Sequence, residues 1–389
     1  MHILIIPSWY PNVSNDLSGG FFREQAIALS KNGVLTGVLV PRALPKKPEL
    51  WKNFYRAPHL IIDEGVITYR PWCICWSRWH SGNWNTLVNK SLRWFDNYCK
   101  SNGRPDLIHA HSVFPGGLVA MAIAKKHKIP FVITEHFSGF ARGLFSPTDL
   151  VIACNVFSCA DALITVSANL LRTLETSCSF SFSNARVIPN ILSDGFALSA
   201  PQSDPSTKAF TFLNVASLVP IKCQDLLLRA FAMAFTEDTG VTLRIGGVGS
   251  ELEPLKALAL DLGIADQVVL LGKLDRGQVL QEMANCHSFV LSSEIETFGV
   301  VVIEALSQGK PVVSTKCGGP ENILHEGNGI FVEKNNVVAL ADGLKRMKLE
   351  YPRFDSELIR GDCLNRFSVD AVLEQLMTIY SDVILRRSK

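Results

Sequence analysis

Two glutamates form the most chemically suggestive pair in the sequence. Glu296 and Glu304 lie in the segment SSEIETFGVVVIEALSQGKPVV, residues 292–313. We expect a buried strand to end before Glu296 and a helix to begin near Phe298 and Gly299, where free backbone N–H groups would attract a phosphate. Glu304 follows Gly299 by five residues, or about 7–8 Å along a helix axis. One carboxylate could therefore bind sugar hydroxyls and the other ribose hydroxyls, with the amides on a diphosphate between them.

The alternative is an exposed loop glutamate followed by an ordinary helix glutamate. The neighbours of Glu304 argue against it, because a solvated carboxylate is not expected among so many apolar residues. These neighbours are Val300, Val301, Val302, Ile303, Ala305 and Leu306.

The same segment resembles the E-x7-E signature of the family 4 retaining glycosyltransferases, which have the GT-B fold. Glu296 and Glu304 match its two glutamates, and the loop CGGPENIL (317–324) matches the next family loop. The resemblance implies a nucleotide-sugar donor bound mainly by the C-terminal half, with the first glutamate on the donor sugar and the second on the ribose. Other residues in register are Thr297, Phe298, Gly299, Val300, Gly309, Pro311, Val312 and Val313.

Lys222 falls where this family places a lysine that binds the diphosphate. It lies in LNVASLVPIKCQDLLLRAF (213–231), which is similar to the first strand and helix of the family's second domain. A lysine there would give the leaving group a compact positive charge. Ser217 stands where the family often has an arginine, and Cys223 stands where it usually has a glycine. Arg23 or Arg142 could supply the missing cation.

A glycine-rich turn in LRIGGVGSELEPL (243–255) by itself suggests a dinucleotide site. Leu252 occupies the third glycine position after Gly247 and Gly249, and no acidic residue closes the next strand. A dehydrogenase is therefore disfavoured, and we assign both glycines to donor binding. Leu271 lies in VVLLGKL (268–274), which is similar to the family segment whose backbone faces the base.

In the first half, polar residues follow strand-length apolar runs. Gly19 and Gly20 precede a helix, and two glycines let a backbone approach a diphosphate closely. DLIHAHS (106–112) places His109 and His111 on one side of a strand. His111 matches a family histidine that reaches the donor sugar, whereas His109 is expected in the core. The next strand end carries two candidates for contact with the acceptor or sugar, Glu135 and His136, and Arg23 and Arg142 are further acceptor-side candidates.

Two doubly wound α/β domains must position these loops, because buried strands alternate with amphipathic helices in both halves. The Ser-, Pro- and Asp-rich stretch 193–208 is the expected linker. We assign residues 1–200 to an acceptor-side domain and 201–371 to a nucleotide-sugar domain, with the helix at 372–389 crossing back to the first. Residues 42–104 are an expected insertion. Ligands in such sheets bind beyond the carboxyl ends of the strands, so the two domains are expected to face each other across a cleft.

The distribution of charge and of tryptophan along the chain indicates which partners the protein could have. The net charge is +2, but residues 1–200 hold 19 Lys and Arg against 12 Asp and Glu, and all seven tryptophans lie there. This half could touch an anionic membrane or an acidic lipid-linked substrate, although a plain solvated face is equally compatible. A Trp-rich insertion (72–84) could instead stack on acceptor sugars. Nucleic acid is disfavoured because no basic stripe accompanies the charge. We expect a cytoplasmic protein, with possible peripheral contact at the inner face of the membrane.

Two further expectations concern thiols and metal. The ten cysteines contain no C-x-x-C pair, and Cys154, Cys159 and Cys286 lie in apolar segments, so reduced buried thiols are expected. No D-x-D pair is present, so no obligatory metal or other cofactor is expected beside the UDP- or GDP-sugar.

The expected activity is retaining transfer of a sugar to a hydroxyl of a glycan or polyprenyl-linked acceptor. The alternatives are a nucleotide-sugar epimerase and a non-catalytic nucleotide-sugar-binding protein.

Overall fold

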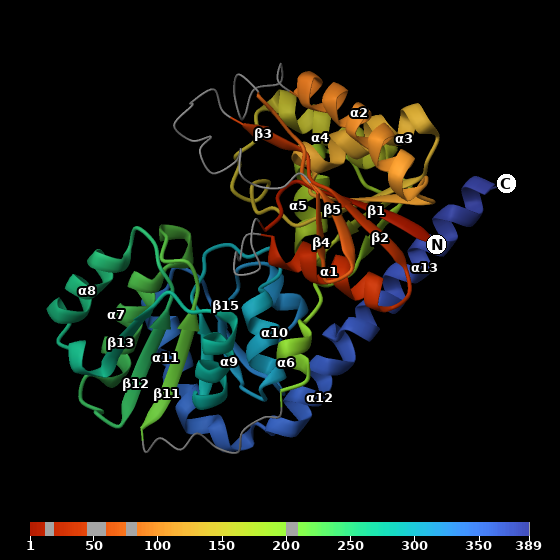
Figure 1. Cartoon of the computed structure of the whole chain (residues 1–389). Coiled ribbons are helices and arrows are strands. Elements are labelled where there is room, and N and C mark those ends of the chain that lie inside the picture. Colours follow the sequence, from red (N-terminus) through yellow and green to blue (C-terminus); the bar gives the residue numbers. More distant parts are fainter. Residues whose placement is uncertain (12–18, 45–59, 75–83, 200–208, 389) are drawn as a thin grey trace. The chain divides into compact units, whose positions relative to one another are not determined.

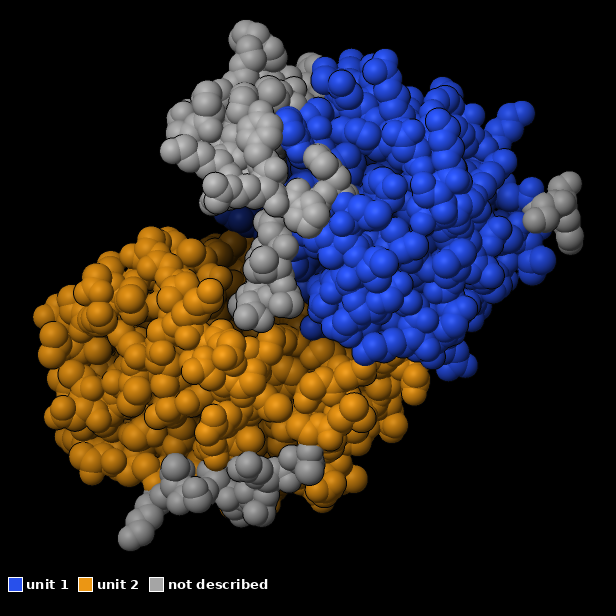
Figure 2. Space-filling model, viewed as in Figure 1, with its two compact units in different colours: residues 1–191, 372–389 blue, residues 192–371 orange. Residues whose placement is uncertain are grey.

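The chain folds into two compact units. The computed structural model describes residues 1–11, 19–44, 60–74, 84–199 and 209–388. Residues 1–191 and 372–389 form the first unit, and residues 192–371 form the second (Figure 2). Residues 192–200, assigned from the sequence to the first domain, thus belong to the second unit. The stretch 193–208, expected as a linker, contains the short helix α6 (Asp194–Ala197).

The first unit is built on a parallel sheet. Its strand order is β10-β9-β8-β7-β1-β2-β5-β4, eight strands within the described residues, and β4 alone runs antiparallel to its neighbour. Strands β1, β7 and β8 are buried along their whole length, as expected when helices cover both faces. A separate parallel pair joins β3 (Arg42–Leu44) and β6 (Trp72–Ile74). The strands of the main sheet are β1 (His2–Pro7), β2 (Leu35–Leu39), β4 (Leu60–Asp63), β5 (Val66–Tyr69), β7 (Leu107–His111), β8 (Phe131–Glu135), β9 (Ala162–Thr165) and β10 (Ala185–Val187).

Helices flank this sheet, as the alternating pattern predicts (Figure 1). The Ser146 hydroxyl caps α4 by accepting the Asp149 N–H, and Asp149 bonds back to Ser146, which satisfies N–H groups that would otherwise lack partners. The last helix, α13 (Val369–Ser388), begins in the second unit and belongs to the first unit from Val372 on. The others are α1 (Gly20–Lys31), α2 (Trp84–Asn102), α3 (Leu118–His127), α4 (Pro147–Cys159), α5 (Ala168–Cys178) and the π-helical turn η3 (Val113–Gly117).

One expectation about the thiols is wrong. Cys154 on α4 and Cys178 on α5 form a disulfide across 24 residues of sequence. Packing of the two helices against each other brings these positions together, and no local motif announces the pair. Cys159 is exposed rather than buried, whereas Cys286 is a buried free thiol, as expected.

The second unit has a parallel sheet with the order β13-β12-β11-β14-β15-β16, six strands among the described residues. Its core lies between the sheet and its helices, where Phe212, Leu227 and Phe231 are fully buried. No described helix of either unit is long and apolar enough to cross a membrane. The strands are β11 (Phe210–Val215), β12 (Val241–Gly246), β13 (Val268–Gly272), β14 (Ser288–Leu291), β15 (Val312–Thr315) and β16 (Gly329–Val332). The helices are α7 (Gln224–Phe235), α8 (Leu252–Asp261), α9 (Arg276–Asn285), α10 (Val300–Ser307), α11 (Val337–Glu350) and α12 (Ser356–Phe367), with short turns η4 (Pro220–Lys222), η5 (Ala265–Gln267), η6 (Gly319–Asn322) and η7 (Tyr351–Arg353).

Candidate active site

Three loops meet at the carboxyl edge of the second sheet. They follow the neighbouring strands β11, β14 and β15 and carry Lys222, Glu296 and the turn 317–319. Backbone bonds join them: Glu294 N donates to Ile221 O and Glu296 N to Cys317 O, each at 2.9 Å. Gly319 N donates in turn to Glu296 O at 2.8 Å. These backbone hydrogen bonds between the three loops therefore fix the position of Glu296.

Lys222 and Glu296 form an ion pair at this edge. Lys222 Nζ donates to Glu296 Oε1, which also accepts from Ser293 Oγ at 3.0 Å. The two side chains are 23% and 14% exposed, so a ligand can still reach them. Because an ammonium group has three donors, Lys222 can keep Glu296 and also donate to a phosphate oxygen.

The start of α10 lies next along the chain and supplies backbone donors. Gly299 precedes it at φ 97°, a left-handed conformation that favours glycine, and no described side chain caps the helix. The turn 317–319 packs closely here, since a Cβ at Gly319 would lie 2.3 Å from Phe298 N. Thr297 and Phe298 therefore lead into α10 along one defined path, and the N–H groups from Gly299 to Val301 suit an anion.

Glu304 is buried on α10, as its apolar neighbours predict. Its side chain is 3% exposed, and its carboxylate pairs with the guanidinium of Arg276 at the start of α9. Burial raises the pKa of Glu304, and Arg276 opposes that rise. Sequence reasoning missed Arg276. The available signal was its place after a strand end, directly behind Asp275, which caps α9.

The glycine-rich turn after β12 packs against the loop after β11. A Cβ at Gly247 would lie 1.9 Å from Ala216 O, and one at Gly249 would lie 2.0 Å from Leu218 O. Both glycines thus allow backbone to approach backbone within the protein. Ser217 is exposed on the loop after β11, and Leu271 is half-buried on β13, the strand that pairs with β12.

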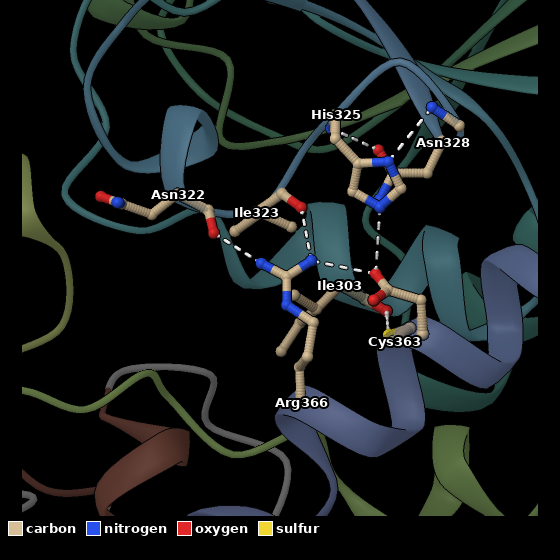
Figure 3. A network of polar contacts seen from close by, with 9 residues as sticks. Ile303, Asn322, Ile323, His325, Asn328, Cys363 and Arg366 are labelled. Carbon is tan, nitrogen blue, oxygen red and sulfur yellow. Dashed lines mark hydrogen bonds and ion pairs between the residues drawn. The ribbon is translucent and has the colours of Figure 1, made fainter.

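A second network of polar contacts binds the chain that follows the turn 317–319, at the end of η6. Arg366 on α12 donates to Asn322 O at 2.6 Å and to Ile323 O at 2.9 Å (Figure 3). Asp362 pairs with Arg366 at 2.9 Å and contacts His325 at 3.3 Å. Cys363 Sγ lies 3.2 Å from Ile303 O, so α12 ties this turn to α10.

The first unit contains a row of three buried histidines. His109 and His111 project from one side of β7, as period two predicts, with ring centroids 4.3 Å apart. His111 Nδ1 lies 3.1 Å from His136 Nε2. His109 bonds to Thr134 Oγ1 and to Tyr380 OH at 2.8 and 2.6 Å, in keeping with its expected place in the core.

Burial keeps these imidazoles neutral. It lowers the pKa of His109 and of His136 to about 3 and that of His111 well below its ordinary value. Phe22 packs on His111 and His136, with centroids 4.8 and 4.9 Å away. Among the described residues His111 Nε2 has no hydrogen-bond partner. Gly19, at φ 76°, caps α1 and Gly20 begins it, two residues before Phe22.

Two of the acceptor-side candidates are bound by other groups of the protein, whereas a third is exposed. Glu135 is fully buried, and its carboxylate accepts the N–H groups of Val113, His136 and Phe137 at 2.8–2.9 Å. Arg23 binds Asp63 through two bonds of 2.6 Å and Glu64 through one of 3.0 Å, which raises its pKa. Arg142 is exposed in a turn after β8.

The second unit pairs Lys222 with Glu296 and packs Gly247 and Gly249 against the loop of Ser217, while Glu304 pairs with Arg276 in the same unit. His111, His136, Gly19 and Gly20 form a separate group in the first unit. Most of the Trp-rich stretch 72–84 lies outside the described residues. Within the described residues, no three His, Cys, Asp or Glu side chains converge as metal ligands would.

Two family matches cover most of the chain. Residues 21–193 match the family described as Glycosyltransferase Family 4. Residues 198–357 match the family described as Glycosyl transferases group 1.

Individual proteins agree with these matches. The chain is 26% identical over 373 residues to the putative teichuronic acid biosynthesis glycosyltransferase TuaC of Bacillus subtilis, covering 90% of each. Its fold matches sucrose-phosphate synthase of Thermosynechococcus elongatus with a TM-score of 0.81 at 19% identity, over 99% of each chain. It also matches the HepE protein of Anabaena, solved in complex with UDP, with a TM-score of 0.74 at 20% identity over 98% of this chain and 100% of that one. These relatives support a glycosyltransferase rather than an epimerase.

Proposed function

Because the chain is a family 4 glycosyltransferase with the GT-B fold, we propose that its second unit binds a UDP- or GDP-sugar whose sugar is transferred to an acceptor hydroxyl. The acceptor is a glycan or a polyprenyl-linked saccharide of the kind used for bacterial surface polysaccharides. One observation carries this proposal. The Lys222–Glu296 pair lies beside the uncapped start of α10, and the buried Glu304 lies one and a half turns further along the same helix.

Each group has a role that its surroundings suit. Glu304 accepts the ribose hydroxyls, and Glu296 accepts hydroxyls of the donor sugar. Lys222 and the N–H groups of residues 299–301 bind the diphosphate and stabilise the negative charge that it gains in the transition state. Ser217, Gly247, Gly249 and Leu271 border the site. The HepE structure with UDP supports a nucleotide donor for a protein of this fold.

The reaction breaks the bond between the anomeric carbon and the diphosphate oxygen, and the electron pair leaves with the diphosphate. The acceptor oxygen forms the new bond to the anomeric carbon, and its proton passes to the leaving phosphate. We propose that the configuration is retained, as the family resemblance implies. No separate base is required, because the leaving phosphate takes the proton of the acceptor. His111 orients the donor sugar as a neutral hydrogen-bonding group, consistent with its depressed pKa.

Substitution of the three charged residues tests the donor site. We expect Lys222→Ala to lower turnover by about 10²–10³, the usual effect of removing one donor to a developing charge. Glu296→Ala should also lower turnover, because it removes the acceptor of the sugar hydroxyls and the partner of Lys222. Glu304→Ala should raise the Kd for the nucleotide about tenfold or more, since a hydrogen bond to a charged group contributes about 1.5–3 kcal/mol. Lys316→Ala is the matched control, because Lys316 pairs with Glu333 on the surface. Unchanged turnover and affinity in all three variants would overturn the assignment.

A thermal-shift screen with UDP, GDP and their sugars identifies the donor. A ligand at a hundred times its Kd stabilises the native state by about 2.7 kcal/mol. The true donor should therefore raise Tm most, and it should do so in Lys316→Ala but much less in Glu304→Ala.

Two finer parts of the proposal concern metal and membrane. We propose that the charge of Lys222 makes a bridging metal unnecessary, so activity should survive a chelator, and its abolition would contradict this. We also propose peripheral contact of the cytoplasmic enzyme with an anionic membrane, supported by the positive excess of residues 1–200. Failure to bind anionic liposomes at low salt would contradict that contact.

A further inference from the structure

The pairing of a buried carboxylate with an arginine on a neighbouring helix points to an additional residue of the donor site. Helices α6, α9 and α10 lie side by side in the second unit (Figure 1). Glu304 on α10 is 3% exposed, whereas Arg276 on α9 is 41% exposed. Arg276 therefore lies on the solvent side of Glu304, which is the side from which a ligand must arrive.

Among the groups that hold the guanidinium of Arg276 are three described residues, Glu304, Ser193 and Phe196. Nη1 donates to Glu304 Oε1, and Nη2 donates to Ser193 Oγ at 2.6 Å. Its Cζ lies 4.9 Å from the centroid of the Phe196 ring, a favourable position for a cation. Because the guanidinium is planar and its donors are fixed, these contacts also fix the orientation of the carboxylate.

Glu304 keeps free acceptor capacity in this arrangement. Each carboxylate oxygen can accept more than one hydrogen bond. Arg276 uses Oε1, and within the described residues no bond reaches Oε2. Two neighbouring ribose hydroxyls could therefore bind this carboxylate while Arg276 stays in place.

We propose that Arg276 is a positioning residue of the donor site, which keeps the buried Glu304 carboxylate ionised and turned toward the ribose hydroxyls. The proposal rests on the proposed function. A buried carboxylate without a partner is costly and takes up a proton instead. In a protonated Glu304 one oxygen becomes a hydroxyl donor, and the group accepts hydrogen bonds more weakly. Donor affinity therefore depends on Arg276 even without direct contact.

Other charged groups near α10 do not replace Arg276. Within the described residues, Arg276 is the one charged group on the elements packed against α10 that bonds to the Glu304 carboxylate. The remaining titratable or charged side chains of those elements are Glu282 on α9, Asp194 on α6, and Glu357, Arg360, Asp362, Cys363 and Arg366 on α12.

The test compares Arg276→Gln with Arg276→Lys and with Arg244→Gln in the full chain. Arg244 makes a two-bond pair with Glu282, also on α9, at 2.7 and 2.8 Å, so it controls for loss of an Arg–Glu pair on that helix. The Kd is measured for whichever of UDP and GDP binds the wild type more tightly, from pH 5 to 9. Arg276→Gln should raise this Kd about tenfold at pH 7.5. As the pH is lowered, this variant should also begin to lose affinity at a higher pH than the wild type, because Glu304 takes up a proton more readily without Arg276. Arg276→Lys should restore part of both effects, and Arg244→Gln should behave as wild type.

A double substitution separates positioning from direct contact. Because Arg276 acts through Glu304, Arg276→Gln should cause no further loss of affinity in a Glu304→Ala background. Additive losses would overturn the positioning role. If Glu304→Ala weakens binding but Arg276→Gln matches Arg244→Gln in Kd and pH profile, this inference fails and the proposed function stands. If Glu304→Ala itself leaves the Kd unchanged, the ribose contact that the proposed function assigns to Glu304 fails, and this inference fails with it.

Discussion

At the scale of single residues, burial decides the protonation of the groups on both units. His109, His111 and His136 are held neutral by loss of solvent. Glu304 is subject to the same loss, but a guanidinium opposes it. Burial and a countercharge therefore act against each other at Glu304, whereas burial is the main cause of the lowered pKa at the three histidines.

The buried histidines make the protein sensitive to acid. The pKa of His109 is about 3 in the folded chain and about 6.5 when unfolded. Below pH 6.5 the unfolded chain therefore binds a proton that the folded chain does not, and stability present above pH 6.5 is lost as the pH falls. Each such histidine should lower the free energy of unfolding by about 1.4 kcal/mol per pH unit.

Urea unfolding between pH 7 and 5 checks this slope. His109→Asn removes one titrating group, so it should lose stability less steeply than the wild type. Thr134→Val is the control, because it removes a partner of His109 at 2.8 Å but leaves the histidine. It should be less stable at every pH and keep the wild-type slope. Equal slopes for His109→Asn and wild type would contradict the prediction.

At the scale of elements, close packing of two loops shapes the site. The turn after β12 bonds to the loop after β11 through Leu218 N to Val248 O at 3.0 Å and Glu251 N to Leu218 O at 3.1 Å. That loop continues into η4 and Lys222. Glycines are required because a side chain at Gly249 would meet the Leu218 carbonyl.

Gly249→Ala should therefore disturb both stability and ligand binding. The new methyl group would displace a backbone carbonyl, at a cost of about 1–3 kcal/mol, and would move the loop that carries Ser217. We expect a lower Tm and weaker binding of the nucleotide. Gly361→Ala on α12 is the matched control, since nothing lies within 4 Å of its added Cβ, and it should leave binding unchanged and stability equal or slightly higher. Wild-type Tm and affinity in Gly249→Ala would refute this account.

The strand-and-helix rhythm could be predicted from sequence because the central strands of both sheets are parallel and buried, so β1 and β14 appear as mainly apolar runs. Glu304 could be predicted for the same reason, as a charge among apolar neighbours. Contacts between residues far apart in sequence could not be predicted. The pairing of Arg276 with Glu304, the two acidic partners of Arg23 and the Cys154–Cys178 bond all depend on how helices and loops pack.

At the scale of the whole molecule, α13 belongs to the first unit through most of its length. It buries an apolar stripe formed by Val372, Leu373, Leu376, Tyr380 and Val383. Tyr380 OH lies 2.6 Å from His109 Nδ1, and Arg387 Nε donates to Asp161 at 2.8 Å. The first unit therefore depends on residues from the opposite end of the chain.

Truncation after Ala371 should unfold the first unit and spare the second. Burial of one large apolar side chain contributes about 1.5–3 kcal/mol, so the loss of five approaches the whole stability of a typical domain, about 5–15 kcal/mol. Hydrogen exchange should then lose protection in β1, β7 and β8 while β11, β12 and β14 stay protected. Truncation after Leu385 removes two exposed arginines, with the Arg386–Asp382 and Arg387–Asp161 pairs, and each loss should change stability by less than about 1 kcal/mol. Persistent protection of β7 after the longer truncation would show that the first unit completes its core without α13.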